Sequence, residues 1–454
     1  MGEPDCPGCR RLEAEVATLR ERVERLTRLL DEALRAGKRQ AAPFSKGPAK
    51  REPKKPGRKP GKDYGAKAHR PPPPPEHIDE THEAPLPDSC PDCGGALDET
   101  DVQQQFQVEI PRQPIYRQFN VHLGRCRQCQ RRVQGRHALQ TSDALGAAGS
   151  QLGPDTQAAL VELNKQAGLS HGKLTRVMQT LFGIRLTRGG SAHIILRAGR
   201  RCAAVYHQLT QTLPAAPWVV PDETGWRVGG GRSWLHGFVT PTATVYAIDR
   251  QRDGSVAQRL LGDDYAGILI HDGWSPYDQF LQARHQQCLA HLLRRCRELV
   301  EQASRAAARF PRQVLELLQE GLRLRDRHQA EEISDHGLAV ARGRLRGRML
   351  DALLPLRTNA ANERLAKHLW HHRQQLWTFL EEPAVDATNW RAEHAMRFGV
   401  ILRKVWGGSR TWAGARAQSV LMSVWRTCWQ QGRSALDFLS QLLRGTPVGL
   451  PFPP

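Results

Sequence analysis

A run of short apolar stretches between residues 214 and 282 constrains the fold of this 454-residue chain more than any other feature. Three stretches rich in β-branched and aromatic residues predict strands, in the order WVV, SWLHGFVT and TVYAIDR, and the glycines at 229–231 turn the first into the second. SVAQRLL predicts a short helix, and AGILIHDG predicts a buried strand. The first strand leads to Asp222 and the fourth ends at Asp272, so each delivers a carboxylate to the edge of a sheet.

This β-β-β-α-β order is the ribonuclease-H-like pattern, in which the first and fourth strands are neighbours. We therefore expect Asp222 and Asp272 to meet, together with Glu393 from the helical segment TNWRAEHAMRFGVILRK. Carboxylates this close repel one another, and Mg²⁺ or Mn²⁺ removes the repulsion because hard cations prefer oxygen ligands. Two such ions activate water or a 3′-hydroxyl on one side of a phosphate and stabilise the leaving oxygen on the other. We interpret the three acids as a divalent-metal site for phosphoryl transfer on DNA.

Each of these acids, taken alone, is better explained as a cap or a turn residue, and only the combination favours a metal site. Glu223 and Asp278 are neighbouring acids that are easily mistaken for ligands. Because Glu223 directly follows Asp222 on a strand, its side chain is expected on the opposite face of the sheet.

The charge of the chain indicates the kind of partner. The formal net charge of +20 favours a polyanionic partner, nucleic acid first. The alternative is a solvated basic surface or a ribosome-associated protein. The length predicts two or three domains. No apolar run reaches membrane-spanning length and no signal peptide opens the chain, so we expect a cytoplasmic protein with no membrane partner.

Six of the ten cysteines occur in CxxC pairs, which is typical of metal ligands in a reducing compartment. The pairs Cys90/Cys93 and Cys126/Cys129 predict a structural Zn²⁺ site of four thiolates in a zinc ribbon over residues 87–140. Two strand-like segments between the pairs, QQFQVEI and IYRQFNVHL, fit a hairpin. No coordination position stays open, so we assign this site no catalysis. Contact with DNA is indicated by four arginines around the second pair: Arg125, Arg127, Arg131 and Arg132.

The N-terminal region predicts a coiled coil over residues 10–36. Its heptad seam consists of Leu12, Val16, Leu19, Val23, Leu26 and Leu30. Valine and leucine at the a positions with leucine at d favour a parallel homodimer, or a higher oligomer. The alternative is an amphipathic helix packed on its own chain. The preceding pair, Cys6 and Cys9, supplies half of a tetrahedral zinc site; either two copies of the chain complete it, or the pair is incidental.

A basic, proline-rich linker is predicted over residues 37–86. Lysine, proline and glycine dominate its segment 46–70, which cannot bury enough surface to offset its ordering entropy. The five prolines at 71–75 predict a stiff polyproline II stretch. This linker is a phosphate-binding tether, a solubilising spacer, or both.

Residues 150–213 predict a helical domain that resembles a helix-turn-helix. Gly168 ends one helix and Ser170 caps the next. This arrangement would turn three side chains toward a DNA groove, those of His171, Lys173 and Arg176. The alternative is a helix pair that serves only as scaffold.

The remaining segments complete the predicted organisation. An Arg-rich all-α insertion is expected over residues 283–383, either to hold DNA ends or to act as a structural lid. The core resumes at 384–412, and the helix that carries Glu393 adds DNA-binding candidates in Arg397, Arg403 and Lys404. In WGGSRT, backbone N–H groups and Arg410 are expected to cradle phosphate. A terminal helix and tail follow over residues 413–454, where seven apolar residues are expected to pack in the core: Val420, Leu421, Trp425, Trp429, Leu436, Phe438 and Leu442.

Five stretches of the chain resemble the DDE transposases of the bacterial insertion sequence 66 family: PDETGWRV, HDGWSPYDQF, QCLAHLLR, TNWRAEHAMR and WGGSRTWAGAR. The resemblance covers nearly the whole chain and implies that Asp222, Asp272 and Glu393 are the metal-binding triad. It gives Cys288 and His291 of CLAH a supporting role near the active site, although the pair also has the form of half a zinc site. The family usually has asparagine and arginine where this chain has Trp390 and His394, so DNA contacts beside Glu393 are expected to differ.

The expected protein is thus a multidomain α+β transposase: a coiled coil, a zinc ribbon, a helix-turn-helix-like domain, and a ribonuclease-H-like α/β core interrupted by an all-α insertion. The resemblance implies nicking of DNA at element ends, joining of the 3′-hydroxyl to target DNA, association with the bacterial nucleoid, and accessory transposition proteins as partners. One alternative is a catalytically inactive DNA-binding regulator. Another is a related nuclease acting on Holliday junctions or RNA–DNA hybrids.

Overall fold

The structure is a computed structural model of the chain. It describes residues 15–16, 18–23, 25–26, 72–98, 100–108, 113–146, 151–303 and 306–446. The chain divides into two compact units, Met1–Pro111 and Arg112–Pro454, and each is described by itself. Within the described residues, no helix combines the length and the apolar character that crossing a membrane requires.

The first unit contains little regular structure among its described residues. Those between 15 and 26 are helical, and their seam positions Val16, Leu19, Val23 and Leu26 are exposed. A 3₁₀ helix, η1 (Pro75–His77), ends the proline run. The predicted coiled-coil dimer stays a prediction, and Cys6, Cys9 and the basic segment 46–70 lie outside the described residues.

The segments predicted as strands between the two CxxC pairs are mostly not strands. Among the described residues of QQFQVEI and IYRQFNVHL, only Leu123 is in a strand. The second unit instead has a short antiparallel hairpin of β1 (Leu123–Arg125) and β2 (Arg132–Gln134), which brackets Cys126 and Cys129. The strand propensity of the longer segments is not matched by a partner strand, and an isolated strand gains no ladder of hydrogen bonds.

A mixed sheet of five strands forms the centre of the second unit. Its strands are β3 (Trp218–Val228), β4 (Gly231–Val239), β5 (Thr244–Asp249), β6 (Ile268–His271) and β7 (Arg284–Gln287). Their order in the sheet is β5-β4-β3-β6-β7. The first three strands form an antiparallel meander, whereas β6 and β7 run parallel to β3. The helix α6 (Ser255–Leu261) connects β5 to β6, as the sequence predicts.

The fifth strand corrects the predicted start of the helical insertion. Helix was expected from Ala283 onward, but residues Arg284–Gln287 form β7 and pair with β6. The sequence RHQQ carries no strand signal, and both glutamines are fully buried. Hydrogen bonds offset part of the cost of this burial, since Gln286 Oε1 accepts from Phe379 N–H at 2.9 Å and Gln287 Nε2 donates to Gln375 Oε1 at 2.8 Å. Gln287 Oε1 is buried and finds no partner among the described residues. Tertiary contacts therefore override the local propensity here.

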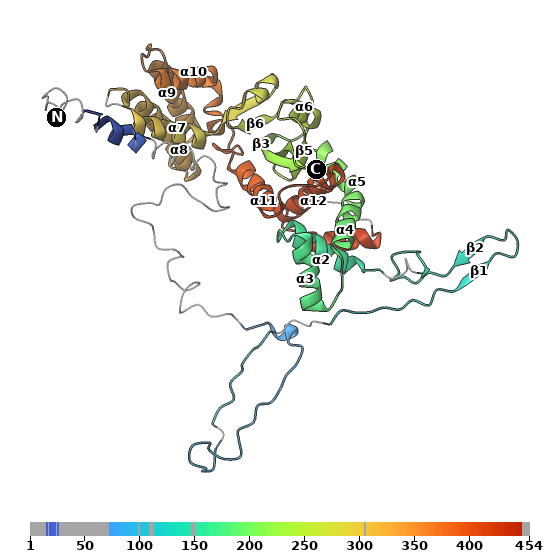
Figure 1. Cartoon of the computed structure of the whole chain (residues 1–454). Helices are drawn as coiled ribbons and strands as arrows, with labels where there is room; N and C mark the ends of the chain where they lie inside the picture. The colour runs from blue at the N-terminus through green and yellow to red at the C-terminus, as the bar shows by residue number, and fades with distance from the viewer. Residues whose placement is uncertain are drawn as a thin grey trace, which may run out of the picture. The chain divides into compact units, whose positions relative to one another are not determined.

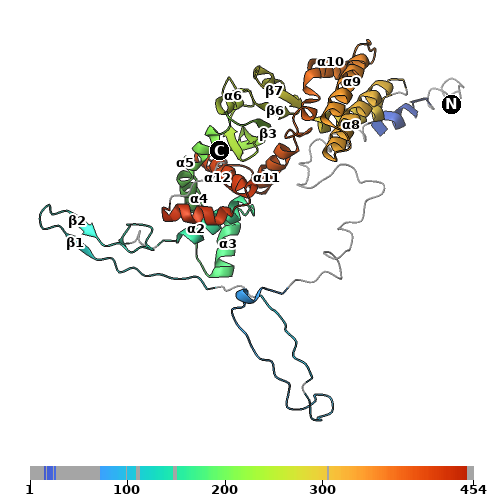
Figure 2. The ribbon, with the colours of Figure 1, turned by 180° about the vertical axis from the view of Figure 1, so that it is seen from behind.

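Two groups of helices flank the sheet at opposite ends of the second unit (Figures 1 and 2). The insertion consists of α7 (Leu289–Gln302), α8 (Arg309–Gln329), α9 (Asp335–Leu353) and α10 (Ala360–His371), followed by the 3₁₀ helices η4 (Arg373–Gln375) and η5 (Thr378–Leu380). The other group consists of α2 (Pro154–Lys165), α3 (His171–Phe182), α4 (Arg188–Arg201) and α5 (Ala203–Gln211).

Side chains alternate between two cores on the two faces of the sheet. Trp218 and Val220 pack in one core with residues of α7 and of α11 (Trp390–Trp406). Val219 and Leu269 pack in the other, with residues of α5, α6 and α12 (Trp412–Gln430). This alternation follows from the two-residue period of a strand and sets which acids face α11.

A ladder of hydroxyl groups on α12 covers the free edge of β5. The N–H groups of Thr244, Tyr246 and Ile248 donate to Thr427 Oγ1, Ser423 Oγ and Ser419 Oγ at 3.1, 2.8 and 3.0 Å. The match is geometric, because two residues of strand span about 6.6 Å and four residues of helix span about 6 Å. The hydroxyls satisfy edge donors that would otherwise invite pairing with another chain.

The helix pair α2–α3 forms as the sequence predicts. Gly168 has φ +72°, which suits glycine, and Ser170 Oγ accepts from Lys173 N–H at the start of α3. The predicted single terminal helix is wrong: α12 ends near Gly432, which has φ +67°, and α13 (Ala435–Arg444) follows. Most of the seven apolar residues that were expected to pack in the core do so, but Trp429 and Leu436 are exposed.

Lys165, the last residue of α2, is a buried basic side chain between the group of helices α2–α5 and α12. It is 4% exposed, its Nζ donates to Gln418 Oε1, and it lies 5.4 Å from the centroid of the Trp406 ring. Burial lowers the pKa of Lys165 to about 7. The folded state therefore releases this proton at a lower pH than the unfolded state does, and the burial of the charge costs most below pH 7.

The variant Lys165→Met is expected to change stability in a pH-dependent way. Its free energy of unfolding, relative to the wild type, should be greatest near pH 6 and should fall as the pH rises toward 10, by roughly 4 kcal/mol at most. Chemical denaturation across this range measures the difference. The control is Lys173→Met, because Lys173 is exposed and should give a flat difference. A flat profile for Lys165→Met would contradict the lowered pKa.

Candidate active site

The register of the sheet brings two of the predicted acids to the same level. β3 and β6 pair in parallel, with Trp218 opposite Ile268 and Val219 opposite Leu269. Three residues further along each chain, this register sets Asp222 level with Asp272. The two acids therefore lie at the same level on neighbouring parallel strands, as the sequence predicts. The prediction that Asp222 ends its strand is wrong, because β3 continues to Val228 and Asp222 pairs with Gly237 of β4, whereas Asp272 directly follows β6.

Asp222 and Asp272 also lie on the face of the sheet that α11 covers. Asp222 follows Trp218 and Val220 at intervals of two residues along β3, so its side chain lies on the same face of the strand as theirs. Trp218 and Val220 pack in the core shared with α11. α11 contacts both β3 and β4, and Glu393 lies in its first turn. The helix thus carries the third predicted acid onto the face where the two aspartates emerge.

The electrostatics of Asp222 reflect this convergence. The pKa of Asp222 is raised to about 7 by burial first and by the nearby charges of Glu223, Asp272 and Glu393, against the opposing effect of a hydrogen bond from the N–H of Glu223 at 2.9 Å. Four carboxyl groups thus share one region, and deprotonation of Asp222 there is unfavourable unless a cation is bound.

Glu223 is held on the other side of β3, in agreement with its expected orientation. Its carboxylate pairs with Arg252 at 3.1 Å and accepts a hydrogen bond from the Tyr277 hydroxyl at 3.2 Å. Tyr277 belongs to the core opposite α11. Burial raises the pKa of Glu223, and the charge of Asp272 adds to the effect. Sequence reasoning missed both partners, and the only local signal was the clustering of acids around Tyr277.

The CLAH segment fastens the start of α11 to the end of the sheet. The N–H of Asn389 donates to Cys288 Sγ at 3.4 Å, and the N–H of Leu289 donates to Ala387 O at 2.9 Å. His291 Nε2 lies 3.6 Å from Glu393 Oε1. Burial raises the pKa of the Cys288 thiol. The predicted supporting pair therefore lies next to Glu393, on the first residues that follow β7.

A chain of histidines anchors the loop behind Asp272, and sequence reasoning missed it. The N–H of Gly273 donates to His271 Nδ1 at 3.2 Å, and His271 Nε2 lies 3.0 Å from His285 Nδ1. His285 Nε2 lies 3.2 Å from Phe280 O, which can only accept. One consistent set of neutral tautomers satisfies every contact. The signal in the sequence was a histidine, His271, at the end of an otherwise apolar buried strand.

The DNA-binding candidates differ in their availability. Five are exposed, namely Lys173, Arg176, Arg397, Lys404 and Arg410. Arg403 is half-buried and donates to Gly225 O, so it fastens α11 to β3. His171, predicted to face a groove, instead bonds Ser191 Oγ at 2.9 Å through Nδ1.

The predicted phosphate cradle in WGGSRT is wrong for two of its amides. The N–H of Ser409 donates to Arg227 O at 2.9 Å, and the N–H of Gly407 donates to Arg403 O at 2.7 Å. The loop adds a bridge to the end of β3, with Val228 opposite Ser409. The Gly-rich turn therefore serves to seat α11 against the hairpin, and Arg410 remains exposed beside it.

The departures from the family pattern are both on the surface. Trp390 and His394 are exposed, and the guanidinium of Arg391 stacks at 5.0 Å from the Trp390 ring. His394 Nδ1 lies 2.7 Å from Arg426 Nη2. Neither residue contributes to the core that supports Glu393, so these departures leave the predicted acid in its helix.

The first CxxC pair, in the N-terminal unit, forms a tight turn. The N–H of Cys90 donates to Gly95 O at 2.9 Å, and its carbonyl accepts from the N–H of Gly94 at 2.8 Å. Gly94 has φ +72°. Hydrogen bonds from the backbone N–H groups of Asp92 and Cys93 lower the pKa of Cys90. Such a turn favours the thiolate, which is the form that binds metal.

The second pair, in the other unit, repeats this turn. The N–H of Cys126 donates to Arg131 O and its carbonyl accepts from Gln130 N–H, both at 2.9 Å. Gln130 occupies the position that Gly94 holds in the first turn, and the φ of Gln130 is +58°. Hydrogen bonds from the backbone N–H groups of Cys129 and Gln128 lower the pKa of Cys126. A side chain other than glycine at this φ is uncommon, which indicates that the turn itself is required.

Comparison with known proteins supplies the family of the chain. No curated protein matches it. Residues 149–417 match the family model described as Transposase IS66 family. This segment is more than half of the 454 residues and includes Asp222, Asp272 and Glu393. The chain therefore belongs to the IS66 family of transposases.

Proposed function

We propose that the protein is a DDE-type transposase that cleaves DNA at element ends and joins the freed 3′-hydroxyl to target DNA. The observation that carries the proposal is the parallel register that sets Asp222 level with Asp272, on the face where α11 carries Glu393. The strand order β5-β4-β3-β6-β7, with β6 and β7 parallel to β3, supports a ribonuclease-H-like core. The proposed enzymatic activity is that of a polynucleotidyl transferase.

The donor set fits Mg²⁺ or Mn²⁺. Asp222, Asp272 and Glu393 offer only oxygen ligands, which these hard cations prefer. The raised pKa of Asp222, caused by burial and by its acidic neighbours, is the signature of a site that lacks a compensating positive charge. When bound, the ions would supply Lewis-acid stabilisation of the attacking and leaving oxygens.

The residues of this chain would act by positioning. Arg403 and the Gly407–Ser409 turn seat the C-terminal end of α11 on the sheet. The hydrogen bond from Asn389 N–H to Cys288 Sγ holds its start, so Glu393 is oriented by contacts at both ends of its helix. His291, 3.6 Å from Glu393, would orient that carboxylate. Attack by water and then by the 3′-hydroxyl would each displace an oxygen at phosphorus. No covalent protein–DNA intermediate is required, and no nucleophilic side chain is assigned.

DNA would be held by cationic side chains. The net charge of +20 and the exposed Lys173, Arg176, Arg397, Lys404 and Arg410 support contacts with phosphates. Such contacts weaken as the salt concentration rises, because the release of counterions from DNA then gains less free energy. The insertion adds further arginines, which would help to hold DNA ends.

The N-terminal modules would assemble the complex. Because the two CxxC turns share one hydrogen-bond pattern, we propose that Cys90, Cys93, Cys126 and Cys129 hold structural Zn²⁺. The heptad segment would form a homodimer or higher oligomer. The proposed location is the bacterial cytoplasm, on the nucleoid, with accessory transposition proteins as partners.

The proposal is tested with DNA that carries the inverted repeats flanking the coding region. In Mg²⁺, the wild type should cleave these ends and transfer strands, whereas EDTA should abolish both reactions. Glu393→Gln should lose both activities, and Glu301→Gln, which removes the same charge from an exposed site on α7, should keep them. End binding without cleavage by the wild type would support the inactive regulator. Cleavage only of junctions or hybrids would support the nuclease.

A further inference from the structure

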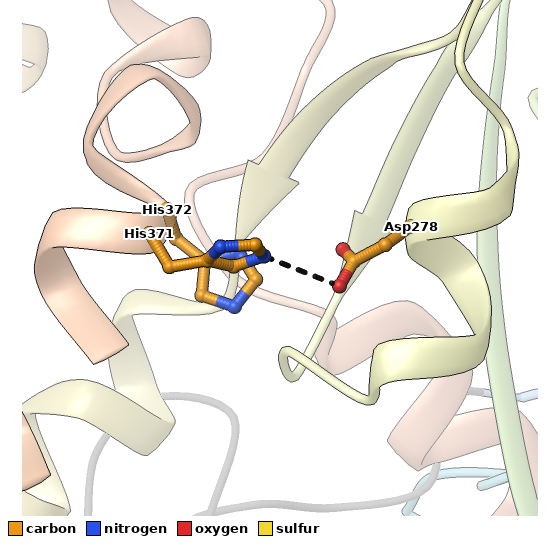
Figure 3. A group of neighbouring side chains, drawn as sticks. All are labelled: Asp278, His371 and His372. Atoms are coloured by element: carbon orange, nitrogen blue, oxygen red, sulfur yellow. Dashed lines mark hydrogen bonds and ion pairs between the residues drawn. The ribbon is translucent and has the colours of Figure 1, made fainter. Parts of the chain in front are cut away.

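Three side chains outside the acidic triad converge where the insertion returns to the core (Figure 3). They are Asp278, from the 3₁₀ helix η3 (Ser275–Gln279), and His371 and His372, from the end of α10 and the residue after it. One potential ligand atom from each lies within 4.8 Å of the others. His371 is exposed, Asp278 is half-buried and His372 is buried, so the group opens to solvent on one side.

His372 is oriented as metal-ligating histidines are. Its Nδ1 lies 2.8 Å from Gln375 Oε1, which also accepts from Gln287 Nε2 at 2.8 Å. Because Oε1 only accepts, Nδ1 carries the proton and the lone pair is left on Nε2. Gln287 Nε2 also lies 3.2 Å from His372 Nδ1. It does not donate to that atom, because an unprotonated Nδ1 would place its lone pair against a lone pair of Gln375 Oε1. A hydrogen bond of this kind fixes the ring and its tautomer around a metal.

Asp278 has an oxygen that nothing in the described part of the chain satisfies. Its Oδ1 is buried and makes no hydrogen bond to any described residue. Its Oδ2 lies 3.4 Å from His371 Nε2, which is long for a charge-assisted hydrogen bond. An unsatisfied buried acceptor destabilises the fold, because it has lost its hydrogen bonds to water and gained none in return. A cation between the carboxylate and the two imidazoles would remove that cost.

We propose that Asp278, His371 and His372 bind a transition-metal cation of the Zn²⁺ class. Two imidazoles and one carboxylate select such ions over Mg²⁺, which prefers oxygen ligands throughout. Ligand atoms on one tetrahedral ion lie about 3.4 Å apart, because each bond is about 2.1 Å long, so the three groups need to close by up to about 1.4 Å. The exposed side leaves the fourth position to water. None of the proposed catalytic acids takes part, so this site stands apart from the proposed function.

The location gives the ion a mechanical consequence. Asp278 lies in the loop that begins at Asp272, and a Cβ at Gly273 would approach His368 Cε1 to 2.9 Å, so α10 already packs closely on this loop. A metal bond from Asp278 to the end of α10 would fasten the insertion to the segment that follows β6. No local pattern indicates this contact, since Asp278 and His371 are distant along the chain.

The test is a metal titration of the full chain in the Asp222→Asn background, with Zn²⁺ competed against a chromophoric chelator. His371→Ala/His372→Ala should bind one Zn²⁺ fewer per chain than the parent. The matched control His328→Ala/His336→Ala also removes two histidines and should bind as many as the parent. Gln375→Leu should weaken the same site by about 10- to 100-fold. Co²⁺ at the site should show ligand-field bands without thiolate charge transfer, which separates it from any cysteine site.

Equal Zn²⁺ stoichiometry and affinity in the parent and the double histidine variant would overturn the proposal. If circular dichroism shows that the double histidine variant is unfolded, Asp278→Asn decides the question. Loss of tight Co²⁺ binding at the site without thiolate ligands supports the proposal, and unchanged binding of Co²⁺ there refutes it. Because Asp222 is already replaced and no DNA is present, the result is independent of transposition.

Discussion

Asp222→Asn is expected to lower strand transfer in Mg²⁺ by about 10³-fold or more while leaving the binding of DNA ends intact. The change removes one anionic oxygen from the proposed metal site, and loss of several kcal/mol of transition-state stabilisation corresponds to this factor. Asparagine keeps the shape of the side chain, and its Oδ1 can still accept the N–H of Glu223. The fold should therefore be preserved, and only the chemistry should fail.

The same variant should be more stable than the wild type when no metal is present. Burial raises the pKa of Asp222 to about 7, above its ordinary value of 3.8, so the folded state holds this proton where the unfolded state has lost it. The wild type therefore loses stability as the pH rises from about 4 to about 7, whereas Asp222→Asn does not. The gain in Tm should be present at pH 8 with EDTA and small at pH 4.

The matched control is Asp351→Asn, an exposed acid on α9. It should change neither strand transfer nor Tm. Strand transfer that survives Asp222→Asn in Mg²⁺ would remove Asp222 from the metal site, and a lower Tm at pH 8 would show that its charge stabilises the fold.

Gly399→Ala is expected to reduce strand transfer by up to about 10²-fold and to destabilise the fold by about 1–3 kcal/mol. Gly399 lies on the buried face of α11, where an added Cβ would clash with the fully buried Leu235 on β4 and lie 3.3 Å from Met422. The complementary contact is at Gly237 on β4, where a Cβ would approach Met396 Sδ to 2.6 Å. α11 thus packs on the sheet more closely than side chains normally allow.

Displacement of this helix would move Glu393, and a shift of about 1 Å in a catalytic group is enough for a loss of this size. The matched control is Gly343→Ala on α9, where an added Cβ meets nothing within 4 Å. The control should be neutral or more stable by up to about 1 kcal/mol, because alanine favours a helix. Thermal denaturation and strand transfer are measured together, and equal behaviour of the two variants would contradict the close-packing argument.

Local features of the sequence predicted much of the central architecture. The strands β3 to β6 and the helix α6 follow from apolar runs and turn glycines. Gly168 and Ser170 mark the break between α2 and α3 because a left-handed residue and a capping hydroxyl act on their immediate neighbours. The adjacency of Asp222 and Asp272 followed from strand order, because residues at equal distances along two neighbouring parallel strands lie at the same level.

Contacts between distant residues decided the rest. β7 exists because buried amides of Gln286 and Gln287 find partners 93 and 88 residues away, at Phe379 and Gln375. Arg403, predicted to bind DNA, donates to Gly225 O of β3, and the Ser409 amide, predicted to bind phosphate, donates to Arg227 O of the same strand. A sequence does not distinguish a hydrogen-bond donor that will face solvent from one that will bond within the protein.

The sequence by itself therefore determined the first four strands of the sheet, the adjacency of Asp222 and Asp272, and the family of the chain. Only the tertiary structure decided how closely α11 approaches the sheet, which cations are engaged, and that Asp278 meets His371 and His372. The physical reason is range: periodicity, capping and turn chemistry act within a few residues, whereas packing and hydrogen-bond satisfaction depend on surfaces that exist only after the chain has folded.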